Sequence, residues 1–184
     1  MGLNLTNPRS QRLPYPAAIP RSRDDLPTVG EGSVPILWVR AGARIVDQLI
    51  LAIPMMAIIW PMIVIDPDGS MEFNTDVRSS LLLLCVAALY EATFLSLWGS
   101  TPGKALLGLR VVRFVDGDHP KVYQCVLRTL TPNLLDFFAL GKVASWLSSL
   151  AQLYSTSVFA SAVFDPIGRG LHDRVAGTIL LRSR

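Results

Sequence analysis

Long apolar stretches dominate the pattern of hydrophobic and polar positions along this chain. Three of them contain at most one charged side chain, and a fourth, residues 122–140, contains Arg128 and Asp136. An α-helix needs about 20 predominantly apolar residues to cross a hydrocarbon core about 30 Å thick. The pattern therefore predicts an all-α membrane protein, a four-helix transmembrane bundle with helices at approximately 38–65, 78–98, 121–140 and 143–164.

Two shorter segments share a second pattern, which is amphipathic and basic. They are GKALLGLRVVR, at 103–113, and HDRVAGTILLR, at 172–182. Aligned on Gly108 and Gly177, each has a charged residue four positions before the glycine and an arginine five positions after it. The pattern predicts a short amphipathic helix that ends at the glycine, followed by an extended segment rich in Val and Ile.

We expect the two extended segments, 109–115 and 178–182, to pair as a small sheet at the cytoplasmic face of the membrane. The chain would then consist of two similar units, each with a first helix, a returning helix and a basic segment that clamps the helix ends. The basic side chains would face lipid headgroups or internal carboxylates. The predicted cytoplasmic clamp comprises Gly103, Lys104, Gly108, Arg110, His172, Asp173 and Gly177.

The placement of charges orients the predicted helices. Basic residues gather in 1–44, 99–121 and 165–184, whereas the loop 66–77 has four acidic residues and no basic one. By the positive-inside rule, both termini are cytoplasmic and the acidic loop is outside, as in a multi-pass protein of the cell (inner or plasma) membrane. The even number of crossings supports a span at 121–140. No motif points to a nucleic-acid partner.

The first 35 residues differ from the rest because they are rich in Pro and Arg and lack apolar periodicity. They contain no apolar core of the length that a signal peptide has. We expect residues 1–35 to be a cytoplasmic tail that is disordered unless a partner binds it. Residues 36–184 would form the transmembrane domain.

Charged residues inside the predicted helices define the main candidate site. Arg40 and Arg44 lie seven and three positions before Asp47, which places all three near one face of a helix. Because an isolated carboxylate in a membrane is costly, Asp47 and Glu91 should pair with these arginines. A structural salt bridge between helices and a proton or cation relay both fit. The candidate intramembrane polar network comprises Arg40, Arg44, Asp47, Glu91, Arg128 and Asp136.

Two further features allow two interpretations each. Asp136 fits a position at the membrane interface as well as a functional one. The fourth predicted helix is rich in Ala and Ser. These small residues suit close packing either against the other three helices or against a partner subunit.

The composition argues against several kinds of site. The chain has only two histidines and two cysteines, which argues against a dedicated metal site. The segment WGSTPGKA lacks the first glycine and the final Ser or Thr of a phosphate-binding loop. No nucleophile arrangement surrounds His172 and Asp173 in the sequence. We therefore expect no enzymatic activity and no cofactor.

Several motifs, taken in order, resemble the RDD family of integral membrane proteins. They are Arg40-x-x-Ala43-x-x-x-Asp47, Thr101-Pro102-Gly103-Lys104, Gly108-Leu109-Arg110-Val111-Val112, Arg128, Leu171-His172-Asp173 and Ala176-Gly177-Thr178. The resemblance covers roughly residues 36–184. It implies that Arg40, Asp47 and Asp173 are the arginine and two aspartates that give the family its name. Transport has been suggested for the family, and some members are thought to exchange cations for protons.

Two functions follow as hypotheses. The preferred one is a non-catalytic accessory or assembly subunit of a larger membrane complex, for example a respiratory one, in contact with other membrane-protein subunits. The alternative is a small-solute or cation/proton transporter that acts through self-association as a homo-oligomer. Asp47 and Glu91 would then be its ion or proton groups. In both cases the chain is surrounded by the lipid bilayer.

Overall fold

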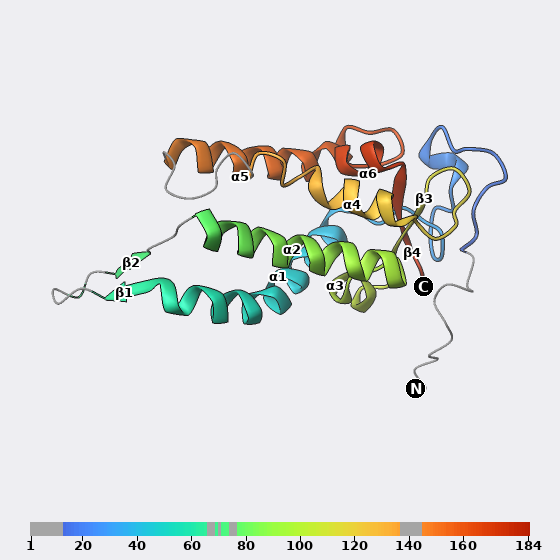
Figure 1. The fold of residues 1–184 in the computed structure, drawn as a ribbon. Coiled ribbons are helices and arrows are strands. Elements are labelled where there is room, and N and C mark those ends of the chain that lie inside the picture. Colours follow the sequence, from blue (N-terminus) through green and yellow to red (C-terminus); the bar gives the residue numbers. More distant parts are fainter. Residues whose placement is uncertain (1–12, 66–68, 70, 74–76, 137–144) are drawn as a thin grey trace, which may run out of the picture.

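Two long helices form the frame of the molecule. The computed structural model describes residues 13–65, 69, 71–73, 77–136 and 145–184. Helix α1 (Leu37–Ile59) continues through the short helix η2 (Trp60–Met62), and α2 (Val77–Trp98) runs back in the opposite direction (Figure 1). Beyond η2, β1 (Ile63–Ile65) pairs antiparallel with β2 (Met71–Phe73), which precedes α2.

These two helices have the properties of membrane spans. Within the described residues, Leu37–Met62 and Val77–Trp98 are the two helices long and apolar enough to cross a membrane. Their side chains are turned outward, since Ile53 is 77% exposed and Leu89 is 66% exposed. Exposure of large apolar side chains over so much of a surface suits hydrocarbon rather than water. Both helices therefore fit a membrane environment.

The first predicted span ends earlier than expected. We predicted a helix to residue 65, but the α-helix changes to the 3-10 helix η2 at Trp60, and the chain is extended from Ile63. Pro61 lies in η2 and has no backbone N–H, so it cannot donate the hydrogen bond that would continue the α-helix. The second prediction, 78–98, agrees with α2 to within one residue.

The third and fourth predicted spans are represented by shorter helices. Helix α4 (Val122–Leu130) gives way to turns that run to residue 136, and Pro132 in these turns disfavours continued helix. Helix α5 (Ser145–Ala160) continues into η3 (Ser161–Val163). The predicted boundaries at 140 and 143 lie outside the described residues. The structure confirms a mostly helical protein with two membrane-length helices, but it does not confirm four spanning helices.

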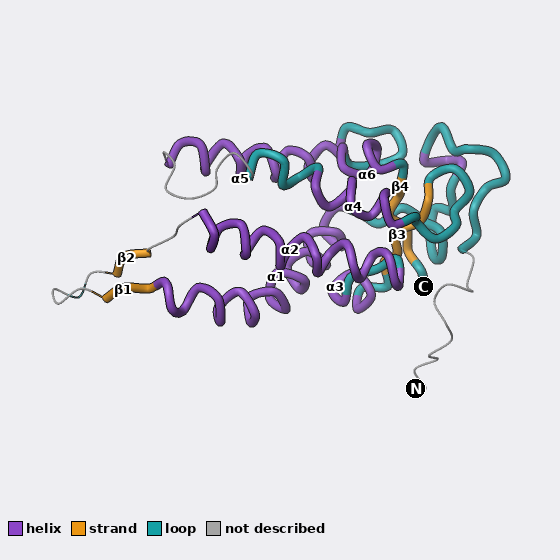
Figure 2. The backbone as a smooth tube through the Cα atoms, in the orientation of Figure 1, coloured by secondary structure: helices purple, strands orange, loops and turns teal. Residues whose placement is uncertain are grey.

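Both predicted helix–glycine–strand segments are present. At the end of each short helix, Gly108 and Gly177 adopt left-handed backbone angles, with φ of +64° and +65°. The two strands pair antiparallel with Val111 opposite Leu180, at the end of the molecule remote from β1 and β2 (Figure 2). The predicted pairing of the two segments is therefore confirmed, with the first strand ending at Arg113 rather than at residue 115. The elements are α3 (Pro102–Leu106), β3 (Leu109–Arg113), α6 (Leu171–Ala176) and β4 (Thr178–Arg182).

Both faces of this sheet are covered, and side chains that alternate along each strand contribute to both faces. The face toward the long helices packs in a cluster of Ala43, Leu95, Leu109, Val111, Cys125 and Leu180. The opposite face packs in a cluster of Leu13, Leu26, Val112, Ile167, Ile179 and Leu181. The short strands are thus a double-sided core in which most side chains are buried.

The N-terminal segment departs from the prediction of a disordered tail. Residues 13–35, here called the N-terminal strap, cover the second face of the sheet, with Leu26 only 3% exposed. Backbone hydrogen bonds from Gly32 to Arg182 and from Arg182 to Ser33 add the strap to the edge of β4. Leu13 and Leu26, which lie among the prolines, bury apolar surface, and this burial offsets the entropy lost when the strap becomes ordered. Residues 1–12 lie outside the described residues.

Candidate functional site

Glu91, on α2, is the centre of one buried ion-pair cluster. It accepts hydrogen bonds from Arg44 Nη1 of α1 at 2.9 Å and from Lys104 Nζ of α3 at 2.8 Å. Burial lowers the pKa of Lys104, and the Glu91 carboxylate opposes that shift. Helix α5 reaches the same cluster, because Arg44 lies over the Phe159 ring at 4.7 Å from its centroid. One carboxylate therefore joins α1, α2 and α3.

Asp47, on α1, lies beside this cluster and is 2% exposed. Its Oδ2 accepts a hydrogen bond from Thr101 Oγ1 at 2.6 Å. Its Oδ1 accepts from the Gly103 backbone N–H at 2.8 Å and from the Tyr90 hydroxyl at 3.0 Å. Thr101 is the N-cap residue of α3, but Asp47 performs the capping, since it accepts from the N–H of Gly103, the second residue and first backbone donor of that helix. The aspartate thus fixes α3 against α1 and α2.

Gly103 occupies the closest approach between α1 and α3. A Cβ atom added there would lie 2.5 Å from the Ala43 carbonyl oxygen and 2.8 Å from the Asp47 backbone nitrogen. Both atoms belong to the backbone of α1 and cannot move aside as a flexible side chain can. Only glycine allows the Gly103 N–H to reach the Asp47 carboxylate.

A second buried cluster joins α4, α6 and β4. Arg128 forms an ion pair with Asp173, and the two side chains are 3% and 1% exposed. Arg128 Nη1 also donates to Thr178 Oγ1 at 2.9 Å, and the Thr178 hydroxyl donates to Asp173 Oδ1 at 3.1 Å. A buried arginine and aspartate are therefore paired with each other and bonded to one hydroxyl between them.

His172 lies against the second cluster. Its Nε2 atom is 3.5 Å from Asp173 Oδ2, and its ring packs against Phe159 at 4.8 Å between centroids. Burial, followed by the positive charge of Arg128, holds the pKa of His172 well below its usual value. The imidazole is therefore neutral in the folded protein at neutral pH.

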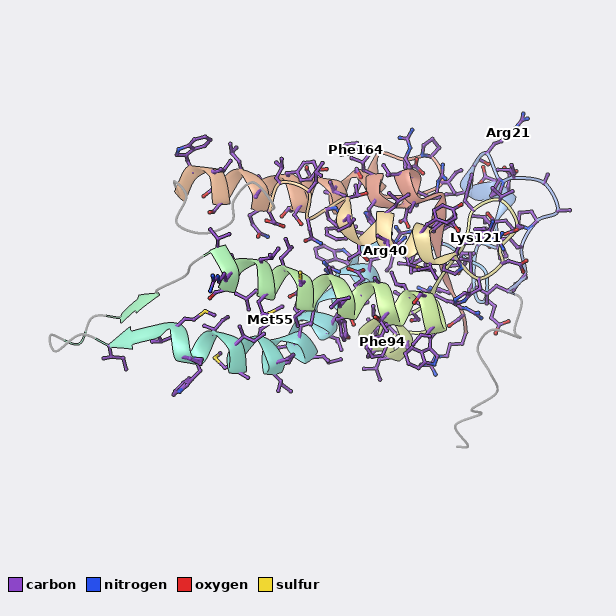
Figure 3. All side chains as sticks on the ribbon, in the orientation of Figure 1. Arg21, Arg40, Met55, Phe94, Lys121 and Phe164 are labelled. Carbon is purple, nitrogen blue, oxygen red and sulfur yellow. The ribbon has the colours of Figure 1, made fainter. Side chains whose placement is uncertain are left out.

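Arg40 lies apart from both clusters. It donates from Nε to the Pro35 carbonyl at 3.1 Å and from Nη1 to the Gly168 carbonyl at 2.6 Å. These bonds hold the strap and the segment before α6, and the Arg40 side chain, labelled in Figure 3, is half-buried. The expected pair with Asp47 is not present among the described side chains. Two other predicted residues are Arg110, buried on β3, and Asp136, half-buried in the turns after α4.

The two clusters occupy corresponding positions in the two units of the chain. When the units are aligned on Gly108 and Gly177, Lys104 and Asp173 stand at the same place, four residues before the glycine. Both are buried. Lys104 forms an ion pair with Glu91 of α2, and Asp173 forms one with Arg128 of α4. In the first unit the short helix carries the cation, Lys104, whereas in the second unit it carries the anion, Asp173. Each short helix is therefore held by one buried ion pair, with the two charges exchanged.

Sequence reasoning missed three hydroxyl side chains that complete the clusters. Thr101 carried a signal, because a threonine before a proline marks the start of a helix. Thr178 belongs to the motif Ala176-Gly177-Thr178, but its role, like that of Tyr90, depends on contacts with α6 and α1 that chain spacing does not show. The three residues are Tyr90, Thr101 and Thr178.

A partly enclosed cavity of about 80 Å³ adjoins the first cluster. It lies between α1, α2 and the turns after α4, and Asp47, Glu91 and Asn133 line it from those three parts. In the part of the chain that the structure describes, no group of three or more His, Cys, Asp or Glu side chains could hold a metal ion. Both cysteines, Cys85 and Cys125, are free thiols.

Comparison with known proteins identifies a matching family model and a curated relative. The RDD family model matches residues 34–177, a range that runs from the strap through α6. The uncharacterized protein YckC of Bacillus subtilis (strain 168) is 28% identical over 142 residues, which cover 77% of this chain and 80% of YckC. No solved structure matches the chain significantly.

Proposed function

Because this chain belongs to the RDD family of membrane proteins, we propose that it is a non-catalytic accessory subunit that assembles with other membrane proteins. The observation that carries the proposal is the exposed face of α5. Ser148, Gln152 and Thr156 recur there at intervals of four residues, and all three are exposed. Spacing of four places them in one row along the helix.

A row of polar side chains is unfavourable against hydrocarbon. Helix α5 runs in the direction of the long helices (Figure 1), so we expect this row to lie at the depth of the membrane. A glutamine at that depth gains about 1–2 kcal/mol when it hydrogen-bonds across a helix interface. A partner helix from another membrane protein would supply those bonds.

The charged clusters also support a structural role. Asp47 accepts three hydrogen bonds, and Glu91 is paired with two cations. A carboxylate that is saturated by internal partners is a poor exchange site for protons or ions, because each partner must be displaced first. The clusters therefore suit fixed joints between helices, and we assign no catalytic step to them.

Purification from native membranes tests the assembly. The full chain carries a tag at Arg184 and is extracted in a mild detergent, and mass spectrometry identifies the co-purified proteins. We expect other membrane subunits in stoichiometric amounts. Gln152→Leu should reduce their recovery several-fold, while Leu153→Ala, at a neighbouring exposed position, should leave it unchanged. Purification of the wild-type chain alone, as a stable homo-oligomer, would contradict the proposal.

The cavity beside Asp47 and Glu91 favours a second candidate, transport of a small solute, a cation or protons by a homo-oligomer. A polar cavity inside membrane-spanning helices is where a transporter binds its substrate. Asp47→Asn should then abolish flux into vesicles that contain the purified protein, while its elution profile and melting temperature stay near wild type. Unchanged flux in a folded Asp47→Asn protein would exclude this candidate.

A further inference from the structure

The cavity between α1, α2 and the turns after α4 has a lining suited to a particular kind of occupant. Seven of its nine lining residues carry polar groups, and these groups share the wall with the apolar surface of Leu51, Ala87 and the side-chain stems. The seven are Arg44, Asp47, Gln48, Tyr90, Glu91, Thr101 and Asn133. Cavities with wholly apolar walls stay dry, whereas a cavity that offers polar partners holds a first water molecule once its volume reaches about 10–15 Å³. A volume of about 80 Å³ is enough for several water molecules.

The charges around the cavity argue against an ion as its occupant. Arg44 contributes one positive charge, and Asp47 and Glu91 contribute two negative charges. Lys104 bonds to Glu91 and brings the local sum to zero. A cation would therefore meet the Arg44 guanidinium, and an anion would meet two carboxylates. A neutral molecule that both donates and accepts hydrogen bonds meets neither difficulty.

The hydrogen-bonding groups of the lining also suit such a molecule. Asn133 uses its Nδ2 atom to donate to the Thr129 carbonyl at 2.7 Å, which leaves its own side-chain oxygen as an acceptor. Tyr90 donates its hydroxyl hydrogen to Asp47, so its oxygen can accept. The Gln48 amide offers one donor group and one acceptor. These groups come from three parts of the chain that the structure brings together.

We propose that this cavity is a binding site for a cluster of water molecules. The waters link the Asn133 side chain to the Arg44–Glu91 pair and to Asp47, and so connect the two units of the chain. Bound water is nearly as favourable as a direct hydrogen bond and reduces the cost of charges inside a membrane span. The site depends only on residues of this chain and needs no partner subunit.

Hydroxyl-radical footprinting in lipid nanodiscs tests the proposal. X-ray pulses convert nearby water to hydroxyl radicals, and mass spectrometry measures the modification rate of each tyrosine in the full chain. We expect the half-buried Tyr90, whose hydroxyl bonds to Asp47 beside the cavity, to be modified readily in the wild-type protein. Ala87 also lines the cavity, so Ala87→Leu fills it and should reduce the Tyr90 rate at least five-fold. The Tyr154 rate should stay the same.

A matched change separates filling of the cavity from general disturbance. Ala52→Leu makes the same substitution at an exposed position of α1 and should leave the Tyr90 rate unchanged. If Ala87→Leu does not fold, the smaller Ala87→Val replaces it, with a reduction of about two-fold expected. A Tyr90 that is unmodified in the wild type, or modified equally in the folded Ala87 variants, would overturn the proposal.

Discussion

Gly103 allows α3 to lie directly on the backbone of α1, with its N–H bonded to Asp47. Glycine is required at this position because the backbones of α1 and α3 lie too close for a Cβ atom, and not because a turn needs a positive φ. The Thr101 hydroxyl bonds to the same carboxylate. The contact between α1 and α3 consequently depends on Asp47 of α1 and on two residues at the start of α3, Thr101 and Gly103, more than 50 positions away in the chain.

Gly103→Ala should destabilise the protein by about 1–3 kcal/mol, the usual cost of forcing an extra methyl group into a packed interior. Thermal unfolding of the detergent-solubilised protein measures the loss. Gly42→Ala is the control, since a Cβ there would meet only a Leu107 side-chain carbon at 3.4 Å. Equal melting temperatures for the two variants would contradict the close approach at Gly103.

The Arg128–Asp173 pair is almost completely buried. Arg128→Leu would leave the Asp173 carboxylate without its cation and should cost about 3–5 kcal/mol. In Arg128→Leu/Asp173→Leu both charges are gone, and most of that loss should be recovered. Chemical denaturation of the three proteins measures the difference. If the double variant is less stable than Arg128→Leu, the expected recovery is absent, and the pair stabilises the fold by more than neutralising its own two charges.

Because the pKa of His172 is lowered in the folded protein, we expect the stability of the protein to depend on pH. The unfolded chain protonates this residue below about pH 6.5, whereas the folded protein keeps it neutral to a much lower pH. The free energy of unfolding should therefore fall by about 1.4 kcal/mol for each pH unit below 6.5, until the folded-state pKa is reached. Melting temperatures at pH 7.5 and 5.5 test this. His172→Gln should show a smaller difference between the two values.

At the scale of elements, the small sheet and the helices before it were predictable from local pattern. The segments around Gly108 and Gly177 combine an amphipathic turn, a residue suited to positive φ and a run of β-branched residues, and each signal acts within a few residues. The two long helices were predictable because hydrocarbon imposes a length on them.

Other elements were not predictable from the same signals. Hydrophobicity suggested a third span, but Pro132 and the turns after Leu130 interrupt the helix. The strap has the composition of a disordered tail, yet it folds because β3 and β4 present a second apolar face. The partner of Asp47 was also missed, because α3 contacts α1 only after the whole of α2 has been placed.

The strap should contribute to stability through few residues. Leu26→Ala removes a side chain that is 3% exposed in the outer cluster of the sheet and should cost about 2–5 kcal/mol. Val29→Ala, in the same strap but 81% exposed, should be neutral. Thermal unfolding distinguishes the two. Similar behaviour of both variants would mean that the strap does not contribute to the core.

For the whole molecule, the arrangement of the long helices places the sheet at one end and β1 with β2 at the other (Figure 1). Both described ends of the chain lie near the sheet. The acidic residues of 66–77 follow the first span, whereas the basic residues gather at the sheet end. This asymmetry leads to a test of orientation in the membrane.

Membrane-impermeant thiol reagents should report that orientation. In a chain with Cys85→Ala and Cys125→Ala, Gly69→Cys should be labelled on intact cells, and Arg184→Cys should be labelled only after permeabilisation. A Cβ atom at position 69 would meet nothing within 4 Å, so access there is unobstructed. Labelling of Arg184→Cys on intact cells would show that the protein has the opposite orientation.

The pairing of β3 with β4 also bears on how the protein is made. The ribosome releases β3 long before β4, because α4, α5 and α6 lie between them. During that interval the long helices can enter the bilayer while Val111 and Val112 remain uncovered. Translation that stops before Thr178 would yield an inserted chain with an open core. Synthesis of β4 therefore separates chains whose sheet can close from those that proteases should remove.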